Sequence, residues 1–317
     1  MLFKGTVLKK RSPSTGYIKT FDNNEIFWEC RGNVSGIPIV FLHGGPGARV
    51  MPSHHSFFNE KDFFSIFFDQ RGCGKSKPFC TLKNNTIQNI VQDMEKIREE
   101  LDIDKWILFG GSWGSTLALY YSITYPERCL GMVLRGIFLG TSKEIDWFLT
   151  GMRKFYPEAN KSFLECLNFS ETENPSSHDI IERASDLIFG DDMIVSQRTS
   201  NAWSSYEMSC STIDYKLREM TGDGAASMAK IELHYFKNKC FLKDNEILDN
   251  VYKLKDIPTY IIQGRHDVIC PPLTAYQLNN RMPSSKLVMV DDAGHSAFEV
   301  GIKNSLFEVL NEIKNTN

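Results

Sequence analysis

Short runs of consecutive apolar residues recur along the chain, and each run is followed by a turn and a segment of helix length. Hydrophobic positions that are continuous rather than alternating are typical of strands buried on both faces. Strands of this kind separated by helices predict an α/β fold with a mostly parallel central sheet flanked by helices. The expected strands lie at residues 37–42, 63–68, 106–109, 131–134, 259–262 and 286–290.

Two helices are predicted from apolar residues at helical spacing. The first covers residues 89–101, where apolar residues recur at intervals of four, three and four positions and so share one face. The second follows Ser112 and ends before Pro126. The apolar residues of the first helix are Ile90, Met94, Ile97 and Leu101.

The alternation of strands and helices stops in the middle of the chain. Residues 141–250 show helices and loops and no run typical of a buried strand, so we expect an inserted helical cap domain there. Residues 1–140 and 251–317 then form the catalytic domain. The cap contains 12 lysines and arginines against 19 aspartates and glutamates, a net charge of −7 that leaves +4 for the rest of the chain. An acidic cap favours a cationic substrate, although an ordinary solvated helical surface gives the same count.

Composition and charge indicate what type of protein this is and which partners are not expected. With 42% hydrophobic and 24% charged residues, the chain of 317 residues has the profile of a globular enzyme. A formal net charge of −3 without lysine- or arginine-rich runs argues against a nucleic-acid partner. The opening residues hold no apolar stretch of signal-peptide length and no 18-residue apolar run follows. We therefore expect a soluble, cytoplasmic protein with no membrane partner.

Eight cysteines are spread along the chain without CxxC pairs or Cys/His metal spacing. A chain of this length is stabilised by its core without disulfides. We therefore expect reduced thiols and no metal. No feature of the sequence sets an oligomeric state.

The segment GGSWGS carries the clearest chemical motif of the chain. Gly110, Ser112 and Gly114 form G-x-S-x-G between an expected strand and an expected helix. In this context the chain turns sharply and raises the serine above the sheet edge, and only glycine on either side lets the crowded backbone pass. The motif predicts that Ser112 is the nucleophile of an acyl-transfer reaction.

A serine nucleophile needs a base, and the base needs an acid that orients it. With the nucleophile on a turn of this kind, the acid and the histidine follow later in the chain, each after a strand. Asp267 follows the expected strand at 259–262, and His295 follows the last one. Asp291 and Asp292 are the rival acids, but they lie too near the loop of the histidine itself.

Two backbone N–H groups must bind the oxygen that becomes negative during acyl transfer. The residue after the nucleophile, Trp113, supplies one. The HGGPG loop at residues 43–47 supplies the other, and Gly45 is the candidate because a side chain there would block the approaching carbonyl group. The loop has no lysine or serine at the spacing of a phosphate-binding loop, so a phosphate site is not expected.

Several long strings in this order resemble the prolyl aminopeptidases, also called proline iminopeptidases, a family of α/β-hydrolase fold. The resemblance covers about residues 36–295 and includes the cap. It implies a serine peptidase that releases an N-terminal proline from small peptides through an acyl-enzyme, without metal or cofactor. The strings are HGGPG, DQRGCGKS, FGGSWGSTLAL, YPERC, LRGIF and GRHD followed by AGH.

The resemblance also implies a binding site for the free amino end of the substrate. In the family two cap glutamates bind this group, and they map onto Glu207 and Glu232. The physical reason holds for any such site, because a protonated amine in a partly dry pocket needs carboxylates. A cap glutamate considered alone is more often a solvated surface residue.

The same resemblance suggests which residues line the substrate pocket. Phe138 and Phe236, with Trp113, are expected to hold the proline ring. Arg135 either balances the charge of the glutamates or forms a structural salt bridge. The sequence departs from the family at Phe148, where a tyrosine is common.

Two other functions remain open from the sequence alone. The same catalytic residues serve an esterase, an amidase or a lactonase, whose substrates lack the amine that the glutamates would neutralise. A binding protein that has lost its chemistry is a second alternative, although nucleophile, acid and base are all in place. An epoxide or haloalkane hydrolase is excluded, because those enzymes need an aspartate where Ser112 stands.

Overall fold

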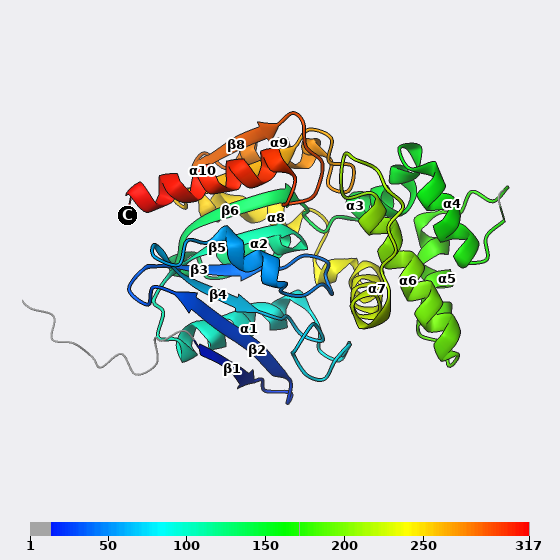
Figure 1. Ribbon diagram of the computed structural model, residues 1–317, viewed down its shortest axis with the longest axis horizontal. Helices are drawn as coiled ribbons and strands as arrows, with labels where there is room; N and C mark the ends of the chain where they lie inside the picture. The colour runs from blue at the N-terminus through cyan, green and yellow to red at the C-terminus, as the bar shows by residue number, and fades with distance from the viewer. Residues whose placement is uncertain (1–13, 171, 317) are drawn as a thin grey trace, which may run out of the picture.

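The computed structural model describes residues 14–170 and 172–316, and eight strands of these residues form one sheet. Their spatial order is β1-β2-β4-β3-β5-β6-β7-β8, and only β2 runs against the others (Figure 1). The prediction of a mostly parallel sheet is confirmed. The strands are β1 Ser14–Lys19, β2 Glu25–Gly32, β3 Ile37–Leu42, β4 Phe63–Phe68, β5 Trp106–Ser112, β6 Cys129–Ile137, β7 Thr259–Gly264 and β8 Ser285–Val290.

The six predicted strands correspond to β3–β8, whereas β1 and β2 were not predicted. β1 lies at the edge of the sheet, and its exposed and half-buried residues alternate along most of its length. A search for continuous apolar runs misses a strand of this kind, because an edge strand has a face in contact with water.

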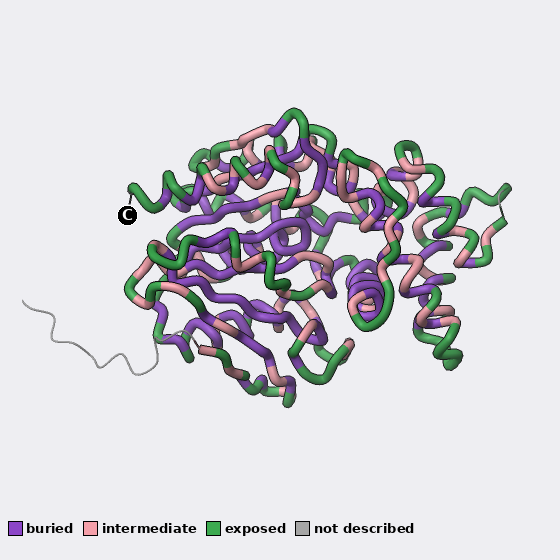
Figure 2. Tube along the Cα trace, in the orientation of Figure 1, coloured by how far each residue is buried: buried purple, intermediate pink, exposed green. Residues whose placement is uncertain are grey.

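Alternate residues of the buried strands enter two separate cores, which explains the continuous apolar runs. In β3, Ile39 and Phe41 belong to one core, and Val40 and Leu42 to the other. One face of the sheet is covered by α10 (Val300–Thr316) and a short 3₁₀ helix (Pro52–Phe57). The opposite face is covered by α1 (Ile87–Glu100), α2 (Trp113–Thr124) and α9 (Pro272–Arg281). The central strands are therefore buried along most of their length (Figure 2).

Both predicted helices are present. α1 begins at Ile87, where the side chain of Thr86 accepts a hydrogen bond from the N–H of Asn89 and so caps the helix. α2 begins directly after Ser112 and ends at Thr124, before Pro126. Across the residues described, no helix is both long and apolar enough to cross a membrane.

Between β6 and β7 the described residues form helices and loops and no strand, and we call residues 138–258 the helical insertion. α3–α7 lie beyond the carboxyl ends of the parallel strands (Figure 1). α8 packs against α2 instead, and the boundary of a separate cap domain at 141–250 stays a prediction. The helices are α3 Ser142–Asp146, α4 Pro157–Cys166, α5 Ser177–Ile188, α6 Met193–Ser209, α7 Gly222–Lys237 and α8 Glu246–Asn250.

Candidate active site

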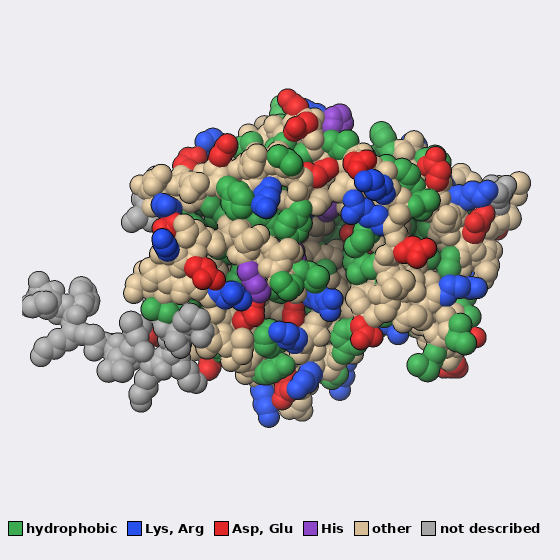
Figure 3. All heavy atoms as spheres, in the orientation of Figure 1, with side chains coloured by type: hydrophobic (Ala, Val, Ile, Leu, Met, Phe, Trp, Pro, Cys, Tyr) green, Lys and Arg blue, Asp and Glu red, His purple; other side chains and the backbone are tan. Residues whose placement is uncertain are grey.

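The surface is hollowed where the helical insertion meets the sheet layer (Figure 3). A cavity of about 200 Å³ lies at this junction. Five of the residues predicted for the site line it together, although they come from widely separated parts of the chain. They are Gly45, Ser112, Arg135, Glu207 and His295.

Ser112 stands at the turn between β5 and α2 in a strained backbone conformation. Its φ of 57° and ψ of −128° lie outside the regions that a residue with a side chain normally adopts. A Cβ atom on Gly110 would overlap the carbonyl oxygen of Gly114, and one on Gly114 would overlap the carbonyl oxygen of Leu42. Glycine is therefore required at both positions by the backbone itself, as expected for a turn that raises a serine above the sheet.

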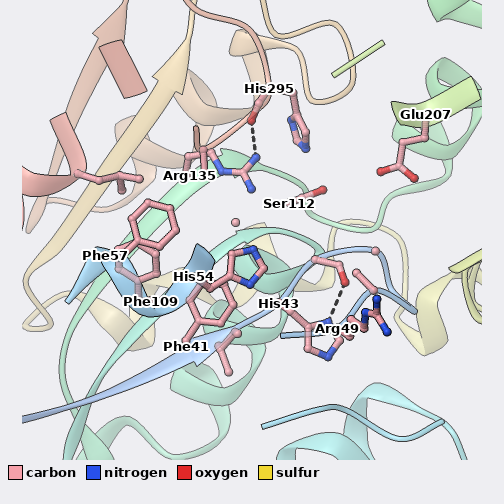
Figure 4. Close-up of a pocket in the computed structure, with 17 residues that line it drawn as sticks. Phe41, His43, Arg49, His54, Phe57, Phe109, Ser112, Arg135, Glu207 and His295 are labelled. Atoms are coloured by element: carbon pink, nitrogen blue, oxygen red, sulfur yellow. Dashed lines mark hydrogen bonds between the residues drawn. The ribbon is translucent and has the colours of Figure 1, made fainter. Parts of the chain in front are cut away.

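Asp267 and His295 are hydrogen-bonded to one another. Asp267 Oδ2 lies 2.8 Å from His295 Nδ1. A carboxylate only accepts, so the neutral imidazole carries its proton on Nδ1 and has Nε2 free to act as a base. Figure 4 shows the imidazole and the Ser112 hydroxyl close to one another at the wall of the same cavity.

The orientation of Asp267 is itself fixed by two further donors. Its Oδ1 accepts the backbone N–H of Cys270 at 2.8 Å, and Gln263 Nε2 lies 3.2 Å from its Oδ2. Gln263, which was not predicted as a site residue, also accepts the N–H of Ile137 at 3.1 Å. The available sign was a polar residue inside the otherwise apolar strand β7.

The HGGPG loop lies directly beside the nucleophile. A Cβ atom on Gly44 would be 3.6 Å from Ser112 Cβ, so the loop passes close to the hydroxyl. Gly45 has a φ of 108°, and a Cβ atom there would lie 2.5 Å from the backbone nitrogen of Gly47. Glycine is thus needed at residue 45 by the turn of its own loop, whereas the prediction relied on room for the substrate.

Glu207 on α6 and Glu232 on α7 are both buried, with 7% and 2% of their surface exposed. Trp203 Nε1 donates a hydrogen bond of 2.6 Å to Glu232 Oε2. Among the described residues, Glu207 Oε2 has no hydrogen-bond partner. Figure 4 shows the Glu207 carboxylate on the far side of the cavity from the sheet, facing Ser112.

The burial of these two carboxyl groups changes their titration. Loss of water raises the pKa of Glu207 to about 8, although the positive charge of Arg135 opposes the change. Burial also raises the pKa of Glu232 well above its usual range, and the neighbouring charge of Glu207 adds to the effect. Both carboxyl groups therefore hold a proton more readily than an exposed glutamate does.

Arg135 contacts the histidine loop rather than the glutamates. Its Nη1 donates a hydrogen bond of 2.6 Å to the carbonyl oxygen of His295. The guanidinium group also packs so closely against Gly111 that a Cβ atom there would overlap it. No hydrogen bond joins Arg135 to either glutamate in the part of the chain that the structure describes, so its effect on them acts through space.

The predicted aromatic residues form a cluster next to the glutamates. The rings of Phe138 and Phe236 have centroids 6.3 Å apart, and Phe148 meets Phe236 edge-on at 5.3 Å. Trp203, which binds Glu232, lies 6.2 Å from Phe236. Phe138 and Phe236 are buried and do not line the 200 Å³ cavity, so the expectation that they hold the proline ring stays a prediction.

Comparison with known families identifies the fold. The family model of the alpha/beta hydrolase fold matches residues 37–302. Solved structures of similar shape include a proline iminopeptidase-related protein from Thermus thermophilus, with a TM-score of 0.60 and 20% identity over 95% of this chain and 96% of that one. Another is an alpha/beta hydrolase from a deep-sea metagenome library, with a TM-score of 0.62 and 18% identity over 93% and 96%. These structures show the fold.

Relatives in sequence are more specific. The proline iminopeptidase of Arabidopsis thaliana is 42% identical over 305 residues, which cover 94% of this chain and 79% of that protein. The proline iminopeptidase of Neisseria meningitidis serogroup B is 40% identical over 304 residues, 94% of this chain and 96% of that protein. These relatives confirm the resemblance found in the sequence motifs. The chain belongs to the proline iminopeptidase family of the alpha/beta hydrolase fold.

Proposed function

We propose that this protein releases an N-terminal proline from small peptides by acyl transfer to Ser112. The observation that supports the substrate class is the buried carboxyl group of Glu207 across the cavity from the nucleophile, with the buried Glu232 near enough to feel its charge. A buried carboxylate without a partner is costly, and a protonated amine removes that cost by forming an ion pair. The names of the sequence relatives point to the same substrate.

In the proposed reaction Glu207 and Glu232 bind the secondary ammonium group of the proline. This holds the prolyl carbonyl carbon beside Ser112 Oγ. His295 Nε2 takes the hydroxyl proton as Oγ attacks, and Asp267 keeps the imidazole oriented and stabilises its positive charge. The N–H groups of Gly45 and Trp113 bind the oxyanion of the tetrahedral intermediate.

The intermediate collapses when the bond between the carbonyl carbon and the peptide nitrogen breaks. His295 gives its proton to the leaving amine, so the shortened peptide departs neutral at that nitrogen. Water then attacks the prolyl ester of Ser112 with His295 again acting as base. Proline leaves, and Ser112 recovers its proton.

The deciding experiment compares four substrates on one preparation of the full chain: proline arylamide, alanine arylamide, N-acetyl-proline arylamide and an acetyl arylester. We expect the proline arylamide to be cleaved with the highest kcat/KM and the blocked amide to be cleaved poorly. Preference for the ester, or indifference to acetylation of the amine, would favour an esterase, amidase or lactonase instead. Absence of all four activities would favour a binding protein.

A further inference from the structure

A single buried amide connects the two chain segments that carry the oxyanion-binding N–H groups. These segments, the HGGPG loop and the start of α2, are separated by about 70 residues of chain. Gln70 follows β4, which lies next to β3 in the sheet. Its side chain is hydrogen-bonded to His43 of the HGGPG loop and to Trp113 at the start of α2. The inference below rests on the proposed acyl-transfer reaction.

Three hydrogen bonds of Gln70 define the connection. Trp113 Nε1 donates to Gln70 Oε1 at 2.8 Å, and Gln70 Nε2 donates to the carbonyl oxygen of His43 at 2.9 Å. The backbone N–H of Gln70 donates to His43 Nε2 at 3.0 Å. The three residues are at most 2% exposed, so water does not compete for these bonds.

His43 extends the connection to the glycines of the loop. Because its Nε2 accepts a hydrogen bond, its Nδ1 carries the proton and donates to the carbonyl oxygen of Gly44 at 3.0 Å. Burial lowers the pKa of His43, although the charge of Asp69 opposes this, and the neutral ring fits both contacts. The chain just after the loop is held by Asp69, whose Oδ1 accepts the N–H of Val50 at 2.8 Å.

The indole of Trp113 has a second contact that does not involve Gln70. Tyr235 packs edge-on against it, with ring centroids 4.7 Å apart. Packing therefore holds the indole ring in the core. The hydrogen bond to Gln70 restrains its distance from His43, to which Gln70 is also bonded. Loss of this bond should leave the fold in place and loosen the spacing between the two segments.

We propose that Gln70 is a positioning residue that sets the distance between the two oxyanion donors, the N–H groups of Gly45 and Trp113. Donors of this kind stabilise a transition state only when they are held within a few tenths of an ångström of their place. A polar residue that is hydrogen-bonded to both segments restrains the distance between them. An apolar residue of the same size fills the space without fixing the distance.

The test compares Gln70→Leu with the parent enzyme. We expect kcat for proline arylamide to fall by about 10- to 100-fold, since displacement of one donor costs on the order of 100-fold. KM and the affinity for proline should change by less than about threefold. Affinity for a boronic acid analogue of proline should fall in parallel with kcat/KM, because its tetrahedral serine adduct places an oxygen between the two donors.

Asn85→Leu is the matched control. Asn85 Nδ2 also donates two hydrogen bonds, to the carbonyl oxygens of Arg71 and Thr81, both at 2.9 Å, and is hydrogen-bonded to neither oxyanion segment. Its Oδ1 accepts from Tyr235 Oη at 3.1 Å, so the variant disturbs the packing partner of Trp113 while the bonds of Gln70 remain. We expect this variant to lose thermal stability while kcat stays within about threefold of the parent. Gln70→Glu, which retains the acceptor for Trp113 and loses the donor to His43 when ionised, should lose kcat as Gln70→Leu does.

The proposal is overturned if folded Gln70→Leu and Gln70→Glu retain kcat within threefold of the parent. It is also overturned if they lose kcat no more than Asn85→Leu does, or if boronate affinity is unchanged. If the parent cleaves only the ester, the proposed substrate is wrong. The role of Gln70 is then tested by the same comparison of kcat with the ester, because both reactions use the same oxyanion donors.

Discussion

The sheet layer and the helical insertion contribute buried polar groups of opposite character to the same cavity. In the sheet layer the polar groups are hydrogen-bonded to one another, as between Asp267 and His295 at 2.8 Å. In the insertion Glu207 Oε2 lacks a hydrogen-bond partner among the described residues, and its pKa is raised to about 8. The hydrogen bond between Asp267 and His295 already orients the imidazole for proton transfer. A buried carboxyl oxygen without a partner, as in Glu207, can instead bind a donor group of a ligand. We therefore expect changes in the sheet layer to affect every acyl substrate, and changes in the insertion to affect only substrates with a free amine.

The largest effect is expected from Ser112→Ala in the sheet layer. Loss of the nucleophile should reduce kcat by about a million-fold for proline arylamide and equally for any ester that the parent cleaves. Alanine adopts the same backbone conformation as serine with a similar cost, so the fold should persist. Calorimetric titration with proline should show unchanged affinity, since the carboxylates of the insertion are intact. Activity within a hundredfold of the parent would exclude Ser112 as the nucleophile.

A smaller loss is expected from Asp267→Asn, again for all substrates. Each carboxylate oxygen of Asp267 meets at least one N–H donor, from Cys270 on one side and from His295 on the other. The amide of asparagine must therefore point its own N–H group at a donor in either orientation. The favoured tautomer of His295 is lost, and kcat should fall by about ten-thousand-fold, as in other triads of this type.

A steady-state assay with proline arylamide and with the ester measures this loss. Gln263→Glu is the paired variant, since it changes a neighbour of Asp267 while the contact between Asp267 and His295 remains possible. A loss of less than tenfold for Asp267→Asn would show that another acid orients the histidine.

Local sequence patterns were sufficient to predict the strands β3–β8 and the turn at Ser112. Continuous apolar runs mark strands buried on both faces, and the backbone contacts of Gly110 and Gly114 depend on residues close in sequence or on the adjacent strand. The relative placement of Asp267 and His295 followed from the order of strands, because the carboxyl ends of parallel strands meet at one edge.

Side-chain contacts between distant segments could not be predicted in this way. Gln70 and Gln263 look like isolated polar residues in the sequence, and their importance comes from partners 43 or 126 positions away. The contact of Arg135 with the carbonyl oxygen of His295 spans 160 positions. Periodicity carries no information about such pairs.

The insertion is tested by Glu232→Gln and Glu207→Gln. We expect kcat/KM for proline arylamide to fall by about 10- to 100-fold, mostly through KM, because an amide does not neutralise the ammonium group. Hydrolysis of the ester should stay within about twofold of the parent. Glu219, an exposed residue of the same insertion, provides the control.

Glu219→Gln makes the same substitution on the exposed surface of the insertion, at a residue that does not line the cavity. If it reduces kcat/KM for the arylamide as much as the buried variants do, the acidic surface as a whole attracts the substrate. If it has no effect, the two buried carboxylates act by direct contact. Equal losses on arylamide and ester in Glu207→Gln would contradict a role in binding the amine.

A pH dependence is expected from the raised pKa of Glu207. Below about pH 8 the carboxyl group is mostly neutral in the free enzyme, and only its ionised form attracts an ammonium group. The ratio of kcat/KM for proline arylamide to kcat/KM for the ester should therefore rise by up to about tenfold per pH unit from about pH 6 to 7.5. It should level off near pH 8, where an α-amino group begins to lose its own proton. Taking the ratio cancels the pH dependence of the steps that both substrates share, and in Glu207→Gln the rise should be absent or much reduced.

The same group links pH to the stability of the free enzyme. Glu207 has a pKa of about 8 in the folded chain and 4.5 as the ordinary value, so the folded state holds more protons between these two pH values. The free energy of unfolding should consequently fall as the pH rises from 4.5 through 8. Proline, which supplies a cation to the ionised carboxylate, should raise the melting temperature more at about pH 8 than at about pH 6. Melting curves of the parent and of Glu207→Gln, with and without proline, measure this difference. If proline raises the melting temperature of the parent equally at both pH values, the carboxyl groups of the insertion do not bind the amine.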